Sequence, residues 1–371
     1  LTYPGLRKAF SEGVSPLFPY LLNCRWHVKK WPSPMLSYSG VNVGNPTAIR
    51  DGESIKIWTS FGGSYIAYWG ESPDGIHGFK SEPDKAITAE QAEAETGLSI
   101  PYGIWQPCVL KWKGKYYMFF FAREGRNPNV GSIMRAKSGD GKTWTDIEVV
   151  VRAELGTWRQ MVWHPYAVVW RDECLLYFLG WNSKTEPLWP SSATDYPLLM
   201  AKADSPDGTF KALNKVSVHM ALGSWRRRPI DHSVINIQDE VLLMACALES
   251  KTIEERAFDM RIGLFASTNG RDFYECRGNP VIIHTLASEK EFVADSSILW
   301  EGARLRMWYE GRTEGQNVVI HYADLIPRHR DLRELFENES VSAGSEVASD
   351  FVCLDGRKTF QAVANKDGDY A

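Results

Sequence analysis

The chain has 371 residues, 44% of them hydrophobic, which is enough to bury one large all-β core or two ordinary ones. Its formal net charge of -4 at pH 7 gives no overall positive field, which argues against nucleic acid or an anionic membrane as a partner. No run of about 18 apolar residues occurs, so we expect a soluble chain without a membrane segment, with the cytoplasm favoured over secretion and the oligomeric state open.

The six cysteines are scattered along the chain without a Cys-x-x-Cys pair. Cys108, Cys174 and Cys246 fall inside apolar runs that resemble strands. We therefore expect buried free thiols rather than a zinc site or a disulfide framework. No ligand spacing argues for a metal, and no cofactor is predicted.

From about residue 40 to 325, aromatic and β-branched runs alternate with Gly, Asp and Pro turns, which is typical of an all-β protein. Five runs begin alike, in chain order with GNPTAI (44–49), WQPCVL (105–110), WHPYAV (163–168), IDHSVI (230–235) and VADSSIL (293–299). The equivalent positions lie 61, 58, 67 and 64 residues apart and are Asn45, Gln106, His164, Asp231 and Asp295. The sequence therefore contains a long internal repeat.

Each of the five units continues with a polar turn, an apolar second strand and a third strand. The second strands are expected at 55–61, 116–122, 174–180, 241–247 and 305–311, and the third at 65–72, 132–138, 198–205, 262–268 and 318–324. In four units a tight turn follows, and we expect its glycine to adopt positive φ, at Gly75, Gly141, Gly208 and Gly270.

Four strands per unit, repeated five times, predict a five-bladed β-propeller. The fifth unit ends near Ile326 after its third strand, so the N-terminal segment 1–44 should supply its outer strand, and KKWPSPMLSYSG (29–40) is the expected piece. The predicted domain is therefore 1–326. Residues 327–371 are expected to form a C-terminal extension packed on the propeller.

One face of this propeller should carry the chemistry. Because neighbouring strands alternate in direction, the starts of the first strands, the ends of the second strands and the long crossovers share a face, whereas the tight turns lie opposite. The side chains expected to converge there are Asn45, Trp105, Gln106, His164, Asp231, His232 and Asp295 from first strands, Arg123, Trp181, Glu249, Glu310 and Arg312 from second strands, and Arg228 from a crossover.

Carboxylates, arginines and tryptophans in one axial funnel are what a sugar site needs. Aromatic faces stack on sugar rings, planar donors hold hydroxyl or carboxylate groups, and two acids in different environments divide the proton transfers. The arginines Arg123, Arg228 and Arg312 would also attract an anionic group, such as a uronic-type carboxylate, a sugar phosphate or inorganic phosphate. Pairing with Asp231, Glu249 or Glu310 would cancel part of that charge.

Five units, first strands that open with an X-Pro motif and Ser-x-Asp-Gly turns together resemble the five-bladed propeller glycosidases, over about residues 31–326. That group includes arabinanases, β-xylosidases, invertases, levansucrases and mannoside phosphorylases. The resemblance implies an enzyme that acts on a carbohydrate. The group usually has an aspartate before the first-strand proline, and commonly one in the third blade, whereas this chain has Asn45 and His164 there.

Because neither residue replaces a carboxylate as base, the acids must lie elsewhere. We predict Asp231, Asp295 and Glu310 as the catalytic set, with Glu249 and Glu124 in reserve, and the other convergent residues as substrate-binding. Each of the three could instead be structural, through capping of backbone N–H groups or pairing with an arginine. The alternatives are a propeller that binds a carbohydrate without cleaving it, and a phosphorylase or group-transfer enzyme in the same funnel.

Overall fold

The computed structural model describes most of the propeller region. The described residues are 17–126, 129–155, 157, 159–181, 197–220, 226–250, 260–302, 304–312, 315, 317–327, 351–352 and 359–360. Among them, only the backbone is described at 129, 181, 212–214, 226–229, 249–250, 351–352 and 359–360.

Strand pairing forms four large sheets, and the largest joins two antiparallel units through the single parallel pair Met161↔Gly131. The strands are therefore grouped into five units, called blades 1 to 5 here. Blade 1 contains β2 (Val43–Asp51), β3 (Ser54–Phe61), β4 (Tyr65–Ser72) and β5 (Asp84–Thr88). Blade 2 contains β6 (Ile104–Trp112), β7 (Lys115–Arg126), β8 (Asn129–Ser138) and β9 (Thr145–Val151). Blade 3 contains β10 (Met161–Trp170), β11 (Glu173–Trp181), β12 (Leu198–Ala203) and β13 (Lys211–Lys215).

Blade 4 contains β15 (Arg226–Pro229) and β16 (Ser233–Ile237), which both pair with β17 (Val241–Ser250), and then β18 (Met260–Ser267) and β19 (Asp272–Glu275). The short β14 (Ser217–His219) adds to β19 in parallel. Blade 5 contains β20 (Phe292–Glu301), β21 (Arg304–Arg312), β22 (Val319–Pro327) and, from the N-terminal segment, β1 (Trp26–Lys30).

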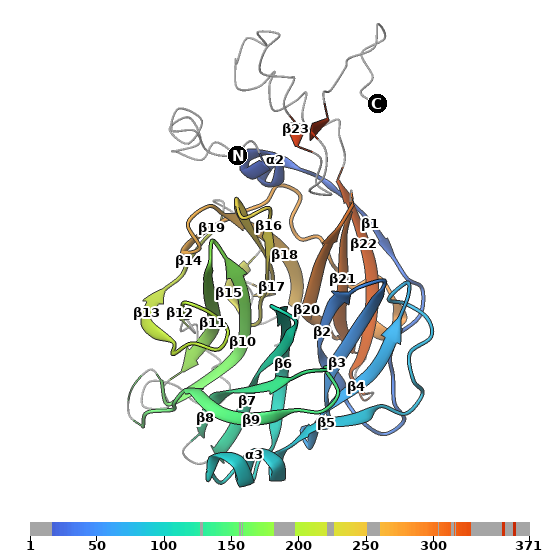
Figure 1. Cartoon of the computed structure of the whole chain (residues 1–371). Coiled ribbons are helices and arrows are strands. Elements are labelled where there is room, and N and C mark those ends of the chain that lie inside the picture. Colours follow the sequence, from blue (N-terminus) through green and yellow to red (C-terminus); the bar gives the residue numbers. More distant parts are fainter. Residues whose placement is uncertain are drawn as a thin grey trace, which may run out of the picture.

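The innermost strands form a closed ring, in which β2 contacts β6, β6 contacts β10, β10 contacts β16, β16 contacts β20 and β20 contacts β2 (Figure 1). The predicted all-β propeller is confirmed, and a ring of five inner strands agrees with the predicted five blades. The helices are short: α2 (Leu17–Asn23), α3 (Ala89–Thr96) and the 3-10 turn η1 (Ala287–Glu289). None of the described helices is long and apolar enough to cross a membrane.

The N-terminal strand closes blade 5, as expected, because β1 pairs antiparallel with β22 from Trp26↔Pro327 to Lys30↔Ala323. The strand begins before the expected 29–40 segment and shares only Lys29 and Lys30 with it. The shift has a simple reason: Pro32 and Pro34 cannot donate to a strand ladder, so the regular pairing ends before them. Beyond Pro327, only the backbones of β23 (Phe351–Val352) and β24 (Thr359–Phe360) are described, so the C-terminal extension stays a prediction.

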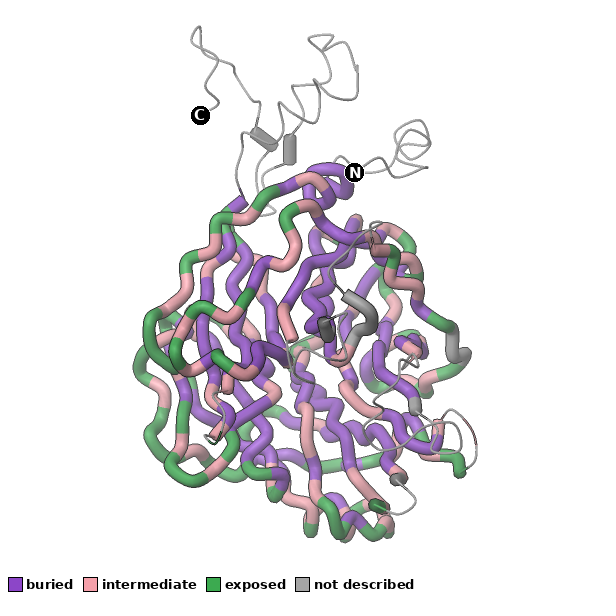
Figure 2. The backbone as a smooth tube through the Cα atoms, turned by 180° about the vertical axis from the view of Figure 1, so that it is seen from behind, coloured by how far each residue is buried: buried purple, intermediate pink, exposed green. Residues whose placement is uncertain are grey.

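The core lies between blades. The second strand of each blade is almost continuously buried, as in β7, where Tyr116 to Ala122 are all buried, because its two faces pack on neighbouring blades. Figure 2 shows buried residues along the strands and exposed residues mainly at the turns. This two-sided burial explains why the second strands read as apolar runs rather than as an alternating pattern.

Hydrogen bonds join the tight turn of one blade to an aromatic side chain of the preceding blade. Trp308 Nε1 donates to the Gly75 carbonyl at 2.8 Å, Trp58 Nε1 to Gly141 at 3.0 Å and Tyr177 Oη to Gly270 at 2.8 Å. These donors occupy equivalent positions of the second strands. In blade 2 that position is Phe119, which cannot donate, and Arg135 of β8 bonds to the Gly208 carbonyl instead, at 2.8 Å.

Three of the four predicted turn glycines adopt positive φ, namely Gly75, Gly141 and Gly270. The prediction is wrong for Gly208, which does not adopt it. In the other three turns the glycine N–H bonds to a serine hydroxyl, whereas Gly208 N–H bonds to the backbone carbonyl of Ser205 at 3.0 Å. The different hydrogen bond removes the need for a left-handed residue.

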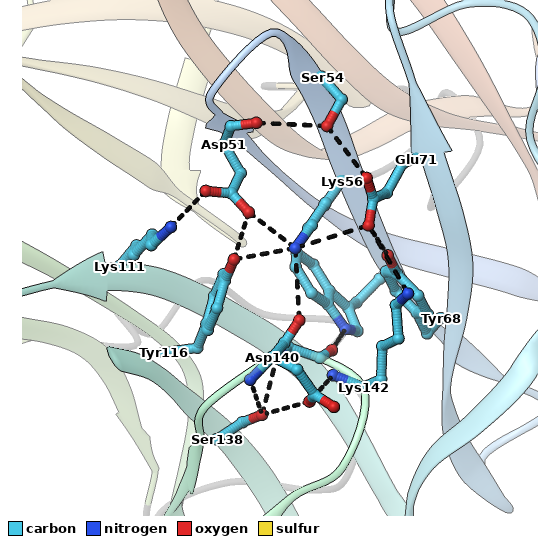
Figure 3. A network of polar contacts seen from close by, with 12 residues as sticks. Asp51, Ser54, Lys56, Tyr68, Glu71, Lys111, Tyr116, Ser138, Asp140 and Lys142 are labelled. Atoms are coloured by element: carbon cyan, nitrogen blue, oxygen red, sulfur yellow. Dashed lines mark hydrogen bonds and ion pairs between the residues drawn. The ribbon is translucent and has the colours of Figure 1, made fainter. Parts of the chain in front are cut away.

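Blades 1 and 2 are also joined by a buried ionic network on the face of the tight turns (Figure 3). The carboxylate of Asp51 accepts from Lys111 and Tyr116 and lies 2.7 Å from Lys56 Nζ, and Lys56 is only 6% exposed. Hydrogen bonds from Lys111 and Lys56 outweigh the effect of burial and hold the pKa of Asp51 below its usual range. Each charge in this network has a partner, so we assign it a structural role.

Candidate active site on the propeller axis

The start of each first strand has the same irregular backbone. Asn45, Gln106, His164 and Asp295 adopt positive φ, at 49°, 58°, 48° and 39°. A register shift interrupts the pairing at each of these positions, which is typical of a β-bulge. In blade 4 the pairing with β17 is interrupted at Asp231, between β15 and β16. Left-handed backbone is uncommon for residues other than glycine, and such strain is concentrated at functional sites.

Ser60 of β3 joins the first two of these residues. Its hydroxyl donates to Asn45 Oδ1 at 2.6 Å and accepts from the backbone N–H of Gln106 at 2.8 Å. Ser60 was not among the residues predicted from the sequence. The signal was present, because Ser60 occupies the position in its second strand that Glu310 occupies in blade 5.

His164 links blade 2 to blade 5. The Oε1 atom of Gln106 accepts from the backbone N–H of His164, and its Nε2 lies 2.9 Å from His164 Nε2. On the other side of the ring, Nδ1 lies 3.0 Å from Asp295 Oδ1. Burial alone would lower the pKa of His164, but the charges of Asp295 and Asp231 outweigh it and raise this pKa.

Asp231 is 1% exposed and is held by backbone donors. Its Oδ1 accepts from the N–H of Ala247 at 3.0 Å, and its Oδ2 accepts from the N–H of Asp295 at 2.6 Å. Burial, with the nearby charge of Asp295, raises the pKa of Asp231 to about 7. Its buried position therefore favours the protonated form of this carboxyl group.

Glu310 reaches the same cluster from the end of β21. It is 6% exposed, its Oε1 accepts from the backbone N–H of Asn45, and its side chain hydrogen bonds to Asp295. Burial and the charge of Asp295 raise the pKa of Glu310 well above its usual range. A Cβ atom at Gly44 would lie 2.3 Å from Glu310 Oε1, so this approach of backbone to carboxyl group requires glycine.

Six predicted residues thus form one chain of contacts around the axis: Asn45, Gln106, His164, Asp231, Asp295 and Glu310. They come from all five blades. His164 and Asp295 keep 13% and 18% of their side chains exposed, so the cluster is open at these two residues.

The structure places the other predicted residues differently. His232 packs against the ring of Tyr177, with centroids 6.4 Å apart, and makes none of these polar contacts. Burial, with the charge of His164, lowers the pKa of His232 to about 3. Trp105 stacks on Phe121 at 5.9 Å. Arg312 Nε donates to Glu291 at 2.9 Å, so its charge is partly neutralised.

The remaining predicted residues are described in part. The guanidinium group of Arg123 lies 5.9 Å from the ring centroid of Tyr102, a residue that the sequence analysis did not select. Glu124, the reserve acid, accepts a hydrogen bond from the hydroxyl of Ser132. The predicted residues Arg228, Trp181 and Glu249 lie in β15, β11 and β17, but their side chains lie outside the described part of the chain.

The described residues offer no metal centre. They contain no group of three or more His, Cys, Asp or Glu side chains arranged to hold an ion. The described cysteines Cys24, Cys108, Cys174, Cys246 and Cys276 are all buried free thiols.

No family model matches the chain, and no curated protein matches it in sequence. Solved structures do match. The N-acetylgalactosamine deacetylase from F. plautii, in complex with blood group B trisaccharide, matches with a TM-score of 0.58 and 12% identity over 86% of this chain and 99% of that one. The GH43 endo-arabinanase from Bacillus licheniformis matches with a TM-score of 0.56 and 13% identity over 80% and 98%.

A third match is Zg3597, a family 117 glycoside hydrolase produced by Zobellia galactanivorans, with a TM-score of 0.55 and 13% identity over 82% of this chain and 91% of that one. At such low identity the likeness establishes the fold alone. It confirms, at the level of the fold, the resemblance to propeller glycosidases that the repeat and the X-Pro motifs had predicted.

Proposed function

We propose that this chain is a glycoside hydrolase-like enzyme that uses the axial carboxyl groups on a carbohydrate. The observation that carries the proposal is the convergence of Asp231, Asp295 and Glu310 with His164, from three blades, into one chain of contacts. Cleavage of a glycosidic bond needs one carboxyl group that holds a proton and a second that acts as base or nucleophile. Different environments for neighbouring acids provide this division of roles.

Glu310 is the proposed general acid. Its raised pKa favours the protonated form, in which the proton lies in the hydrogen bond to Asp295. This hydrogen bond has to open before a glycosidic oxygen can enter between the two carboxyl groups, which lie about 5 Å or more apart in glycosidases. Asp295 is the proposed base or nucleophile, because its side chain is 18% exposed and contacts the imidazole of His164. Asp231 is the proposed positioning residue, because its carboxyl group binds the backbone N–H of Asp295.

The ligand class has separate support. Structural neighbours carry the names arabinanase, arabinofuranosidase and glycoside hydrolase, and the deacetylase structure holds a trisaccharide. Trp105 at the start of β6 is partly buried and could offer the edge of its ring to a sugar. Phosphorolysis or group transfer remains within the proposal, because the same acid would protonate the leaving group whichever nucleophile attacks.

A second candidate is a propeller that binds a carbohydrate without cleaving it. The observation in its favour is Asn45, which stands where the propeller glycosidases usually have an acid. Its side chain accepts from Ser60 and its backbone N–H bonds to Glu310, so it has a structural place in the cluster. Incubation with oligosaccharides separates the two candidates, because a binding protein returns its ligand unchanged.

The test of hydrolysis uses a panel of plant and animal polysaccharides and three amide variants, Asp231→Asn, Asp295→Asn and Glu310→Gln. We expect wild-type chain to release reducing ends from one class of glycan, and each variant to lose about 100-fold or more in turnover. The matched control is Asp84→Asn, which removes a surface carboxylate paired with Lys80 and should leave turnover within about twofold. Full turnover in all three axial variants would refute the assignment.

A further inference from the structure

Two arginines share one exposed aromatic ring at the end of β7. The guanidinium carbons of Arg123 and Arg126 lie 5.9 Å and 5.5 Å from the ring centroid of Tyr102. Tyr102 is 39% exposed and Arg126 is exposed, whereas Arg123 is half-buried. The ring therefore holds two like charges near each other on the surface, by cation–π contact.

No described carboxylate neutralises the charge of this pair. Neither guanidinium group has a carboxylate partner among the residues that the structure describes, and Arg123 makes only a long contact from Nε to the carbonyl of Gly125, at 3.4 Å. The acid between them in sequence, Glu124, instead accepts from Ser132. Arg50, Arg135 and Arg306, by contrast, each have a carboxylate partner.

Burial, with the charge of Arg126, lowers the pKa of Arg123. The two positive groups therefore repel each other as the protein stands, and an anion between them would relieve this repulsion. The guanidinium fork matches a carboxylate or a sulfate through two parallel hydrogen bonds, and a tyrosine hydroxyl can donate a third.

The pair lies on the face of the axial cluster. Tyr102 precedes Gln106 by four residues, which is at most about 13 Å of extended chain. The backbone N–H of Arg123 donates to the carbonyl of Gly103 at 3.0 Å, which fixes the end of β7 beside the start of β6. An oligosaccharide bound at the axis can therefore reach Tyr102 with a neighbouring sugar unit.

We propose that Tyr102, Arg123 and Arg126 form a subsite for an anionic substituent of the carbohydrate, either a uronate carboxylate or a sulfate ester. The proposal rests on the proposed function for its sugar ligand and adds the class of sugar. The subsite selects glycans that carry a negative charge next to the unit bound by the axial cluster.

The experiment compares wild-type chain with the double variant Arg123→Gln/Arg126→Gln by isothermal titration calorimetry. The probes are three sets of oligosaccharides of matched length, which are neutral, uronate-bearing and sulfate-bearing, at two salt concentrations. The matched control is Arg171→Gln, because Arg171 also stacks on an aromatic ring, 4.0 Å from the centroid of Trp170, but at a turn on the opposite face. All variants are checked for their thermal midpoint.

We expect wild-type chain to bind one anionic set at least tenfold more tightly than the neutral set, with an affinity that falls as salt rises. The double variant should lose this preference, and the control should keep it. The preferred set distinguishes a carboxylate from a sulfate ester. Equal binding of charged and neutral sets by wild-type chain, or an anion preference that survives in the double variant, overturns the proposal.

Failure of this subsite and failure of the hydrolase proposal can be told apart. Binding by calorimetry does not require turnover, so the subsite can be present in a protein that cleaves nothing. Conversely, loss of turnover in Glu310→Gln without any anion preference would support the axial acids and refute the subsite.

Discussion

The imidazole of His164 contacts two side chains, Gln106 and Asp295, that favour different protonation states of the ring. Gln106 Oε1 accepts from the backbone N–H of His164, so Gln106 Nε2 must donate to the ring, and the ring Nε2 must accept, which requires neutral imidazole. Asp295, 3.0 Å from Nδ1, favours the charged form instead. The orientation of the Gln106 amide thus favours the neutral ring of His164, whereas the nearby carboxylates favour the charged ring.

The variant Gln106→Glu should shift this balance. A carboxylate can accept both from the backbone N–H and from a protonated Nε2, so the pKa of His164 should rise by about one unit or more. The measurement is an NMR titration of the histidine ring protons. The exposed His219 serves as an internal control, because it pairs with Asp272 and does not contact Gln106. An unchanged or lower midpoint for His164 would show that the amide does not oppose protonation.

The raised pKa of Glu310 predicts a pH-dependent stability. Between the two pKa values the folded chain keeps the proton of this carboxyl group, whereas the unfolded chain has lost it. The contribution of the group to stability is therefore fully present below its ordinary pKa of 4.5. It is lost as the pH rises through the pKa of the folded chain. The variant Glu310→Gln removes this loss, and its amide can still accept from Asn45 and donate to Asp295. It should gain stability relative to wild type between pH 5 and pH 8.

Urea unfolding at both pH values measures this gain, at about 1.4 kcal/mol for each unit of pKa shift removed. Asp84→Asn, at the surface, should show the same small difference at pH 5 and pH 8. If Glu310→Gln shows no greater change than this control, the carboxyl group is not protonated in the folded chain. The same variant is expected to lose turnover, which is the usual relation between stability and activity at a catalytic group.

The hydrogen bonds between blades predict a further stability effect. Tyr177→Phe removes the hydroxyl that donates to Gly270 and leaves a buried carbonyl group without its partner, at a cost of about 1–3 kcal/mol. The control is Tyr65→Phe, because Tyr65 lies at a strand start and is only half-buried. Equal midpoints in thermal unfolding for both variants would mean that the aromatic packing, and not the hydrogen bond, joins these blades.

Much of the fold could be predicted from the sequence, because every unit of the repeat has to meet the same packing requirement. Each unit buries its faces only against its neighbours, so each needs the same apolar second strand and the same tight turn. The helix α3 was missed, although Thr88 caps its N-terminus and Gly97 its C-terminus, because the helix lies inside a crossover expected to be a loop. The start of β1 depends on tertiary pairing with β22, which no local pattern specifies.

Six of the predicted site residues lie in contact in the structure, but the sequence did not show how they touch. The X-Pro motifs marked Asn45, Gln106 and His164, and the repeat marked Asp231 and Asp295 as their equivalents. Which side chains touch depends on the bulges and on the angles between blades, so the contact of His164 with Asp295 could not be foreseen. Tyr102 was missed because its significance comes from Arg123 and Arg126, which only the folded strand end brings over its ring.

A buried ion pair also joins the closing strand of blade 5 to η1, and its contribution to stability can be tested separately. Lys30 of β1 lies 2.6 Å from Glu289 of η1, with side chains 12% and 0% exposed. Glu289 also accepts from the hydroxyl of Tyr309 at 2.6 Å and from the N–H groups of Thr285 and Leu286, each at 3.0 Å. The N-terminal strand thus contributes the only described cation paired with this buried carboxylate.

Lys30→Met should cost about 3–5 kcal/mol in urea unfolding, because it leaves the charge of Glu289 buried without a cation. The double variant Lys30→Met/Glu289→Gln should recover a large part of this loss, since the amide can still accept from Tyr309 and carries no charge. A double variant that is as unstable as Lys30→Met alone would contradict the argument, because the loss would then come from packing of the lysine side chain and not from the uncompensated carboxylate.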